Sequence, residues 1–196
     1  MQRHDRNRRR FVAGLLTAGV AGLTLLRGSA SAQSNLAPTP MCDDGDEPTP
    51  RQTEGPFFTP NSPERTTLRD DGMPGTPITL TGFVLTRSCQ PVAGALVELW
   101  HADDRGEYDN VGYRLRGHQF TAADGSYRFE TIVPGVYSGR TRHFHAKFQA
   151  PGGRVLTTQF YFPGEPGNDR DRLFDPALLL QIDGGVARYD TVLDLR

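Results

Sequence analysis

The sequence predicts an all-β protein, an antiparallel β-sandwich built as a single compact domain with extended loops. Short segments rich in β-branched and aromatic residues alternate between apolar and polar positions, and turns containing Gly, Pro and Asp separate them at regular intervals. No amphipathic helix of normal length interrupts this pattern. The first two expected strands are predicted to form a hairpin or to lie side by side. The expected strands cover residues 78–85, 92–100, 126–132, 143–150, 155–162 and 186–193.

Residues 1–32 have the pattern of an export signal. Arg8 and Arg9 precede an apolar run over residues 11–26, and small residues at 29–32 form a cleavage pattern. The paired arginines and the mild, glycine-containing run resemble the twin-arginine type, which carries folded proteins. A membrane anchor is the alternative, but the run is shorter than the ~20 apolar residues that a span needs. We therefore expect a periplasmic or secreted protein that meets a membrane only during export.

Two further segments follow the signal. Residues 33–50 are rich in Pro, Asp, Thr and Ser and are expected to form a flexible leader, and residues 51–196 are expected to form the folded domain. The net charge of −1 offers no broad basic surface, so nucleic acid is not an expected partner. Cys42 and Cys89 lie outside any CxxC spacing, and in an oxidising compartment they form one bridge or remain two free thiols.

The most informative motif is the histidine pair His143 and His145. Alternation along a strand places both imidazoles on one face and turns Phe144, Ala146 and Phe148 to the other. Imidazole is the commonest protein ligand for metals, so the pair predicts half of a metal site. Taken alone, the pair is equally compatible with a solvent-facing strand.

Two tyrosines are candidates for the other half of the site. Tyr108 and Tyr137 each follow a glycine-containing turn, although tyrosines in such places also tie loops down through their hydroxyls. A phenol has an unperturbed pKa near ~10, so a phenolate ligand requires a hard, strongly Lewis-acidic metal. Ferric iron fits better than zinc, because two phenolates, two neutral imidazoles and one hydroxide balance its charge.

These residues lie within a set of segments that resembles the intradiol ring-cleavage dioxygenases, the family of the catechol, protocatechuate and hydroxyquinol dioxygenases. The resemblance covers about residues 50 to 176, nearly the whole expected domain, and is far more specific than a lone His-x-His motif. The matching segments are residues 53–58, 68–71, 80–84, 91–102, 106–108, 123–129, 131–134 and 156–162.

The resemblance implies a function and a ligand set. Tyr108, Tyr137, His143 and His145 would hold one non-haem Fe(III), with Tyr137 and His143 as the axial pair. The substrates would be a small aromatic diol and O2, with Tyr137 acting as a base, and the product would be a muconate-type dicarboxylic acid. Family members often associate through the edges of the sandwich, so a homo-oligomer is possible.

The resemblance also implies two residues that act on the substrate side. Arg140 matches an arginine that stabilises charge developing on the ring, and Gln159 matches a glutamine held near the same site. Arg142 departs from the pattern, because the segment reads Arg-Thr-Arg-His-Phe-His where the family more often has Arg-Pro-Ala-His-Ile-His. If Arg142 faces the pocket, it would pair with a substrate carboxylate and favour protocatechuate over catechol or hydroxyquinol.

Two other classes of protein remain as alternatives. One is an exported β-sandwich binding module that retains the scaffold without catalysis, because folds of this kind host many functions. The other is a zinc-dependent hydrolase that uses the two histidines, but the sequence offers no clear third carboxylate ligand at a suitable spacing.

Overall fold

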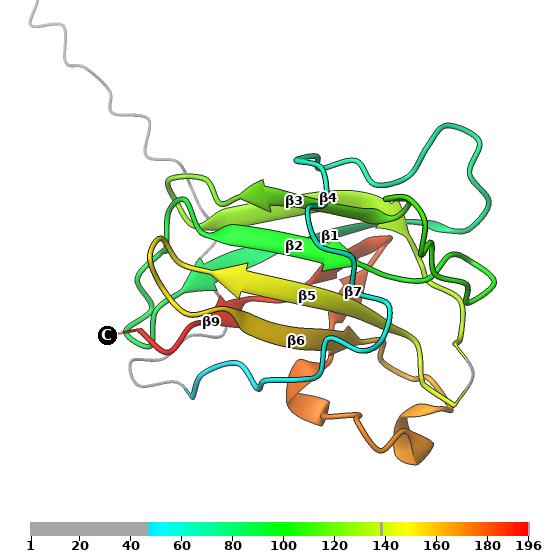
Figure 1. Ribbon diagram of the computed structural model, residues 1–196. Helices are drawn as coiled ribbons and strands as arrows, with labels where there is room; N and C mark the ends of the chain where they lie inside the picture. Colours follow the sequence, from blue (N-terminus) through cyan, green and yellow to red (C-terminus); the bar gives the residue numbers. More distant parts are fainter. Residues whose placement is uncertain (1–46, 138, 196) are drawn as a thin grey trace, which may run out of the picture. The chain divides into compact units, whose positions relative to one another are not determined.

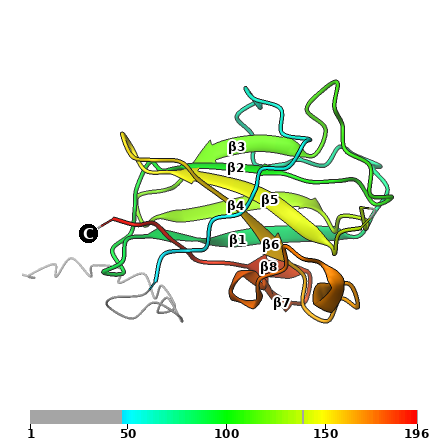
Figure 2. The same cartoon turned by 60° about the horizontal axis from the view of Figure 1, so that its bottom comes forward.

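The computed structural model describes residues 47–137 and 139–195, so the predicted signal, most of the predicted leader and Cys42 lie outside the described residues. Two β-sheets pack face to face in this part of the chain (Figures 1 and 2). The two helices found there are single turns of 3-10 helix, η1 (Asn168–Arg170) and η2 (Pro176–Leu178). No helix in the described ranges is long and apolar enough to span a bilayer. The predicted all-β sandwich is confirmed.

One sheet has the strand order β4-β1-β8-β7, with β9 also pairing with β1, and the other has the order β3-β2-β5-β6. The second sheet is antiparallel throughout, whereas β8 and β9 run parallel to β1 in the first. The strands of the first sheet are β1 (Pro77–Leu85), β4 (Ser126–Ile132), β7 (Gln181–Asp183), β8 (Val186–Arg188) and β9 (Thr191–Val192). Those of the second are β2 (Leu96–Trp100), β3 (Arg116–Phe120), β5 (His143–Gln149) and β6 (Leu156–Tyr161).

The core lies between the two sheets and follows from side-chain alternation. Ile78, Leu80 and Val84 point inward from β1, while Phe144 and Phe148 point inward from β5. Both phenylalanines are fully buried. Each such side chain removed from water contributes ~1.5–3 kcal/mol, so this alternation holds β5 in one register.

Two expectations about the strands are corrected by the structure. The segments expected at 78–85 and 92–100 are not neighbours in one sheet, because the chain crosses from the first sheet to the second after a short bridge between Leu85 and Pro91. Strand β3 was not predicted, because Arg-Gly-His-Gln-Phe has no apolar alternation. Backbone pairing with β2 creates this edge strand.

The outer face of the second sheet is covered by residues 47–68, which we call the strap. The strap, drawn in cyan, crosses β6, β5 and β2 and reaches β3 (Figure 1). At one end the backbone N–H of Gln52 donates to the carbonyl of Thr157 at 2.8 Å, and at the other that of Arg65 donates to the carbonyl of His118 at 2.9 Å. The polar face of this sheet is therefore enclosed rather than open to water.

The strap begins inside the segment that was predicted to be a flexible leader. Thr49 is buried and exchanges hydrogen bonds with the backbone of Val192, donating its N–H at 2.9 Å and accepting at its hydroxyl at 2.9 Å. The last residues of the predicted leader, 47–50, therefore lie against the domain next to the predicted boundary at Arg51. Of the two cysteines, Cys89 is disulfide-bonded.

A buried histidine next to β2 makes the stability of the domain depend on pH. His101 is enclosed between the carbonyl of Ala102 and the hydroxyl of Thr131, and burial lowers its pKa to about 4. Below its unfolded pKa of 6.5 only the unfolded chain takes up this proton, so the free energy of unfolding falls as the pH drops from 6.5 to 4. We expect this loss to reach about 3 kcal/mol.

Urea unfolding of wild type and His101→Gln across this pH range tests the expectation. The free energy of unfolding of the variant should fall less between pH 6.5 and pH 4 than that of wild type. The difference is the contribution of His101, because the other histidines titrate in both proteins. Parallel curves would show that His101 is not held neutral by the fold.

Candidate metal centre

His143 and His145 open strand β5 and point to its outer face, under the strap, as the alternation predicts. Their Nε2 atoms lie 3.1 Å apart. The Nδ1 atom of His143 is 2.6 Å from the carbonyl oxygen of Thr141, which only accepts, so Nδ1 carries the proton and Nε2 has a free lone pair. A histidine that binds a metal through one ring nitrogen usually donates the N–H of the other to a carbonyl or carboxylate, which fixes the orientation of the ring.

Burial keeps both imidazoles neutral. It lowers the pKa of His143 to about 4 and places that of His145 well below its ordinary value. The indole of Trp100 lies almost parallel to the ring of His145, with centroids 5.0 Å apart. On the strap, Gly55 passes so close that an added Cβ would lie 3.3 Å from the Cε1 atom of His145. The ring is thereby fixed between Trp100 and the strap.

Tyr108 joins the histidine pair. Its hydroxyl oxygen lies 3.4 Å from the Nε2 atom of His143. Burial raises the pKa of Tyr108 well above its ordinary value, so the phenolate needs a nearby cation to form. Two cis ligands with metal bonds near 2.1 Å are about 3 Å apart, so these donor atoms have the separations that a metal ion requires.

Tyr137 is brought into the same cluster by ring contacts. Its ring meets that of Tyr108 edge-on with centroids 6.0 Å apart, and Phe57 of the strap contacts both. Phe57 stacks on Tyr108 at 4.6 Å and meets Tyr137 edge-on at 5.2 Å. Over the described ranges, no group of three or more histidines, cysteines or carboxylates is placed to hold a metal. The rings that accompany the histidine pair in this cluster include those of Tyr108 and Tyr137.

A close approach of two glycines sets the spacing of the tyrosine-bearing loops. A Cβ on Gly106 would lie 2.3 Å from the carbonyl oxygen of Val136, and one on Gly135 would lie 2.3 Å from the backbone nitrogen of Gly106. The N–H of Gly135 also donates to the carbonyl of Asp103 at 2.6 Å. Backbone thus packs on backbone where a side chain would force the loops apart.

Arg140 and Gln159 lie beside the histidine pair, as the resemblance implies. Gln159 pairs in register with His145 across β5 and β6, and its Nε2 donates to the carbonyl of Thr53 at 2.8 Å. The Nη2 atom of Arg140 donates to the Oε1 atom of Gln159 at 2.6 Å. The Nε atom of Arg140 donates to Asp171 at 2.8 Å. Gln159 therefore connects the strap to Arg140.

Four contributors to the site were not predicted from the sequence. Gly55 and Phe57 lie in a matching segment that received no role, and the hydroxyl of Tyr161 lies 3.4 Å from Nη2 of Arg140. Asp171 is one of several loop acids, and no local pattern distinguishes it. Only the three-dimensional contacts show that these residues belong to the site.

Arg142 has partners of its own within the domain. Its Nε atom donates to Glu165 at 2.9 Å, and its Nη1 atom donates to the carbonyl of Pro134. The guanidinium of Arg142 is therefore held by groups of the domain itself, and no contact in the structure supports the expected pairing with a substrate carboxylate.

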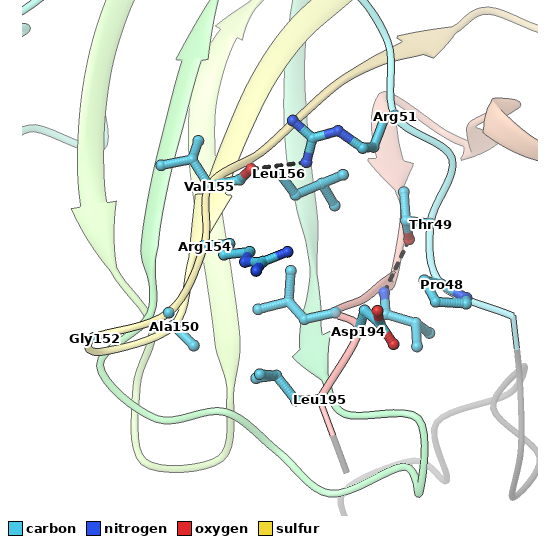
Figure 3. A pocket seen from close by; sticks show the side chains of 13 residues that line it. Pro48, Thr49, Arg51, Ala150, Gly152, Arg154, Val155, Leu156, Asp194 and Leu195 are labelled. Atoms are coloured by element: carbon cyan, nitrogen blue, oxygen red, sulfur yellow. Dashed lines mark hydrogen bonds between the residues drawn. The ribbon is translucent and has the colours of Figure 1, made fainter.

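A pocket of about 610 Å³ lies at the other end of β5 (Figure 3). It begins at Ala150, just beyond the last residue of the strand, whereas His143 is the first. Seven steps along a strand correspond to roughly 20 Å, so this pocket is separate from the histidine pair. Its lining comes from residues 48, 49, 51, 150, 152–156 and 192–195.

The glycine contact yields a matched pair of variants. In Gly106→Ala the new Cβ meets the carbonyl of Val136, which should separate the tyrosine loops, weaken metal retention and lower the free energy of unfolding by ~1–3 kcal/mol beyond the control. Gly152→Ala is that control, because Gly152 also has a positive φ (+69°, against +87° for Gly106) but nothing within 4 Å of the added Cβ. Metal analysis and urea unfolding measure both effects. Equal behaviour of the two variants would contradict the role of the close approach.

Comparison with known proteins places these features in a family. Residues 53–194 match the family described as "Dioxygenase". The solved dioxygenase domain of a dioxygenase carbohydrate-binding protein fusion from the cellulolytic bacterium Streptomyces sp. SirexAA-E is 55% identical, with a TM-score of 0.74. That alignment covers 76% of this chain and 100% of that domain.

Characterised enzymes are also similar. Catechol 1,2-dioxygenase 2 of Acinetobacter lwoffii is 35% identical over 144 residues, which are 60% of this chain and 52% of that enzyme. The protocatechuate 3,4-dioxygenase beta chain of Burkholderia cepacia is 36% identical over 118 residues, 51% of this chain and 50% of that one. The chain thus spans about half the length of each of these two relatives. The match over residues 53–194 and the likeness to the Streptomyces domain show that the chain belongs to the intradiol ring-cleavage dioxygenase family.

Proposed function

We propose that this protein uses Fe(III) and O2 to open the ring of a catechol-type 1,2-dihydroxybenzene between its two hydroxylated carbons, giving a muconate-type dicarboxylic acid. The convergence of the Nε2 atoms of His143 and His145 with the hydroxyl of Tyr108 carries the proposal. The names of the relatives, which include a catechol and a protocatechuate dioxygenase, support the same reaction class.

The donor set fits ferric iron. Tyr108, Tyr137, His143 and His145 would hold the ion, the histidines as neutral ligands and the tyrosines as phenolates. Bound there, the ion would supply the Lewis acidity that makes the ring of a diol reactive toward dioxygen. Burial raises the pKa of Tyr108, so this phenol needs a strongly charged cation to ionise, which favours Fe(III) over zinc.

Tyr137 would be the base. Tyr108 is fixed by its stacking on Phe57 and its contact with His143, whereas the recorded ring contacts of Tyr137 are edge-on and its neighbour Val136 is exposed. Tyr137 is thus the tyrosine better suited to accept a proton from a substrate hydroxyl and move aside. Tyr108 would stay in place throughout the reaction.

Arg140 would stabilise the negative charge that develops as the ring is attacked. Its guanidinium is largely shielded from solvent and is fixed by Asp171 and Gln159, so its orientation does not change during the reaction. The carbon–carbon bond between the hydroxylated carbons breaks, and each of these carbons gains one oxygen atom from O2. Catechol plus O2 has the composition of the dicarboxylic acid, so no external reductant is needed.

The substrate class follows from the polar groups near the site. Because Arg142 is engaged by Glu165 and Pro134, we propose a diol that does not depend on Arg142 for binding, such as catechol or hydroxyquinol. An exported enzyme would meet aromatic diols released from plant polymers. The similar dioxygenase domain from a cellulolytic bacterium, fused there to a carbohydrate-binding protein, supports this setting.

The metal proposal predicts a coloured protein. Charge transfer from phenolate to Fe(III) should make the iron-loaded protein red-brown, and Tyr108→Phe should weaken and shift this absorption because it removes one of the two phenolates. Tyr127→Phe is the control, since its hydroxyl bonds to the carbonyl of Tyr189 in the core. A colourless wild-type protein without iron by elemental analysis would instead favour an exported binding module.

The reaction proposal predicts a defined product. Under labelled O2, catechol should give a dicarboxylic acid that carries both labelled oxygen atoms, as measured by mass spectrometry. Removing the Arg140 guanidinium in Arg140→Gln should lower kcat by about 10²–10³-fold. Retention of the wild-type kcat would contradict the role given to Arg140.

The substrate proposal predicts that Arg142 does not select the diol. Arg142→Gln should change the ratio of kcat/KM for protocatechuate and catechol by less than about threefold, below the contribution of one charge-assisted hydrogen bond. A selective loss of protocatechuate turnover in this variant would show instead that Arg142 reads a carboxylate.

A further inference from the structure

We propose that Asp171 is a positioning residue whose one carboxylate holds both the guanidinium of Arg140 and the backbone that orients His143. The inference rests on the proposed function, because it assigns Asp171 through two residues that act there. It explains why a carboxylate is buried beside a site whose metal donors are imidazoles and phenols.

The carboxylate of Asp171 makes two contacts, which we call its Arg140 arm and its His143 arm. In the first, the Nε atom of Arg140 donates to both oxygens of Asp171, at 2.8 Å and 3.1 Å, and the Asp171 side chain is 2% exposed. The Nη2 atom is occupied by Gln159, whereas Nη1 makes no hydrogen bond within the described residues. The guanidinium is therefore held along one edge, which leaves Nη1 available to a substrate.

The second arm reaches His143 through Thr141. The Oδ2 atom of Asp171 accepts the backbone N–H of Thr141 at 2.8 Å, and the carbonyl of Thr141 accepts Nδ1–H of His143 at 2.6 Å. The hydroxyl of Thr141 also donates to Asn168, at 2.7 Å. A shift of Asp171 would therefore turn the imidazole plane as well as the guanidinium.

The turn that carries Asp171 is itself locked in place. The N–H of Leu173 donates to Oδ1 of Asp171 at 2.9 Å, and Nδ2 of Asn168 donates to the carbonyl of Phe162 at 3.0 Å. A Cβ on Gly167 would lie 3.0 Å from the hydroxyl of Thr141, so the turn packs directly on the segment before β5. A rigid support of this kind is what a positioning residue requires.

Asp171→Asn tests the proposal with little change in shape. Both carboxylate oxygens accept N–H groups. An amide nitrogen at the Oδ2 position would face the N–H groups of both Arg140 and Thr141, and one at the Oδ1 position would face those of Arg140 and Leu173. Loss of the negative charge weakens the contact with Arg140 in either orientation. We expect kcat to fall about 10- to 100-fold with a smaller change in KM, and the visible absorption of the iron-loaded protein to shift. Asp124→Asn, which alters a turn carboxylate that accepts the N–H of Ser126, should change neither.

The path through Arg140 is tested by a double-mutant cycle. In an Arg140→Gln background, Asp171→Asn should lower kcat by a much smaller factor than in wild type, because the guanidinium it orients is gone. Equal factors in both backgrounds would overturn the Arg140 arm, and an unshifted absorption would overturn the His143 arm. Asp171→Glu keeps the charge and offers the same test, with a smaller effect, if Asp171→Asn does not fold.

The outcomes separate this inference from the proposed function. A red, active wild type with an equally active and equally coloured Asp171→Asn variant would refute the positioning role and leave the dioxygenase assignment intact. A wild type without iron or activity would refute the proposed function itself.

Discussion

The site depends on the alternation of side chains along β5. One face of this strand supplies Phe144 and Phe148 to the core, and burial of these rings fixes the register. The same register turns His143 and His145 to the opposite face with their Nε2 atoms 3.1 Å apart. A slip by one residue would place the imidazoles in the core and phenylalanines at the candidate metal site, so one constraint sets both the burial of the core and the placement of the imidazoles.

Enclosure by the strap gives this face its chemistry. Gly55 packs against the buried ring of His145 and Phe57 stacks on Tyr108, and burial keeps the imidazoles neutral and opposes ionisation of Tyr108. The imidazoles of such a site do not readily take up protons. A highly charged cation would bind there more readily, because it would compensate the negative charge of the phenolates. Arg140 adds one positive charge, and the buried carboxylate of Asp171 holds it in place.

Sequence patterns predicted the parts of this protein that obey local rules. The β5 segment has strict alternation, so its two faces follow directly, and Tyr108 and Tyr137 sit after turns in a recognisable order. The crossing of the chain between sheets after Leu85 and the edge strand β3 were not predictable, because backbone pairing with distant strands decides both. Gly106 and Asp171 act through contacts with residues far along the chain, and no local pattern reveals such contacts.

The central claim is that the two imidazoles and two tyrosine oxygens bind one ferric ion. A crystal of the iron-loaded protein, measured at the iron absorption edge, tests this directly. We expect a single anomalous peak within bonding distance of Tyr108, Tyr137, His143 and His145. No peak beneath the strap, or a peak bonded to other side chains, would contradict it.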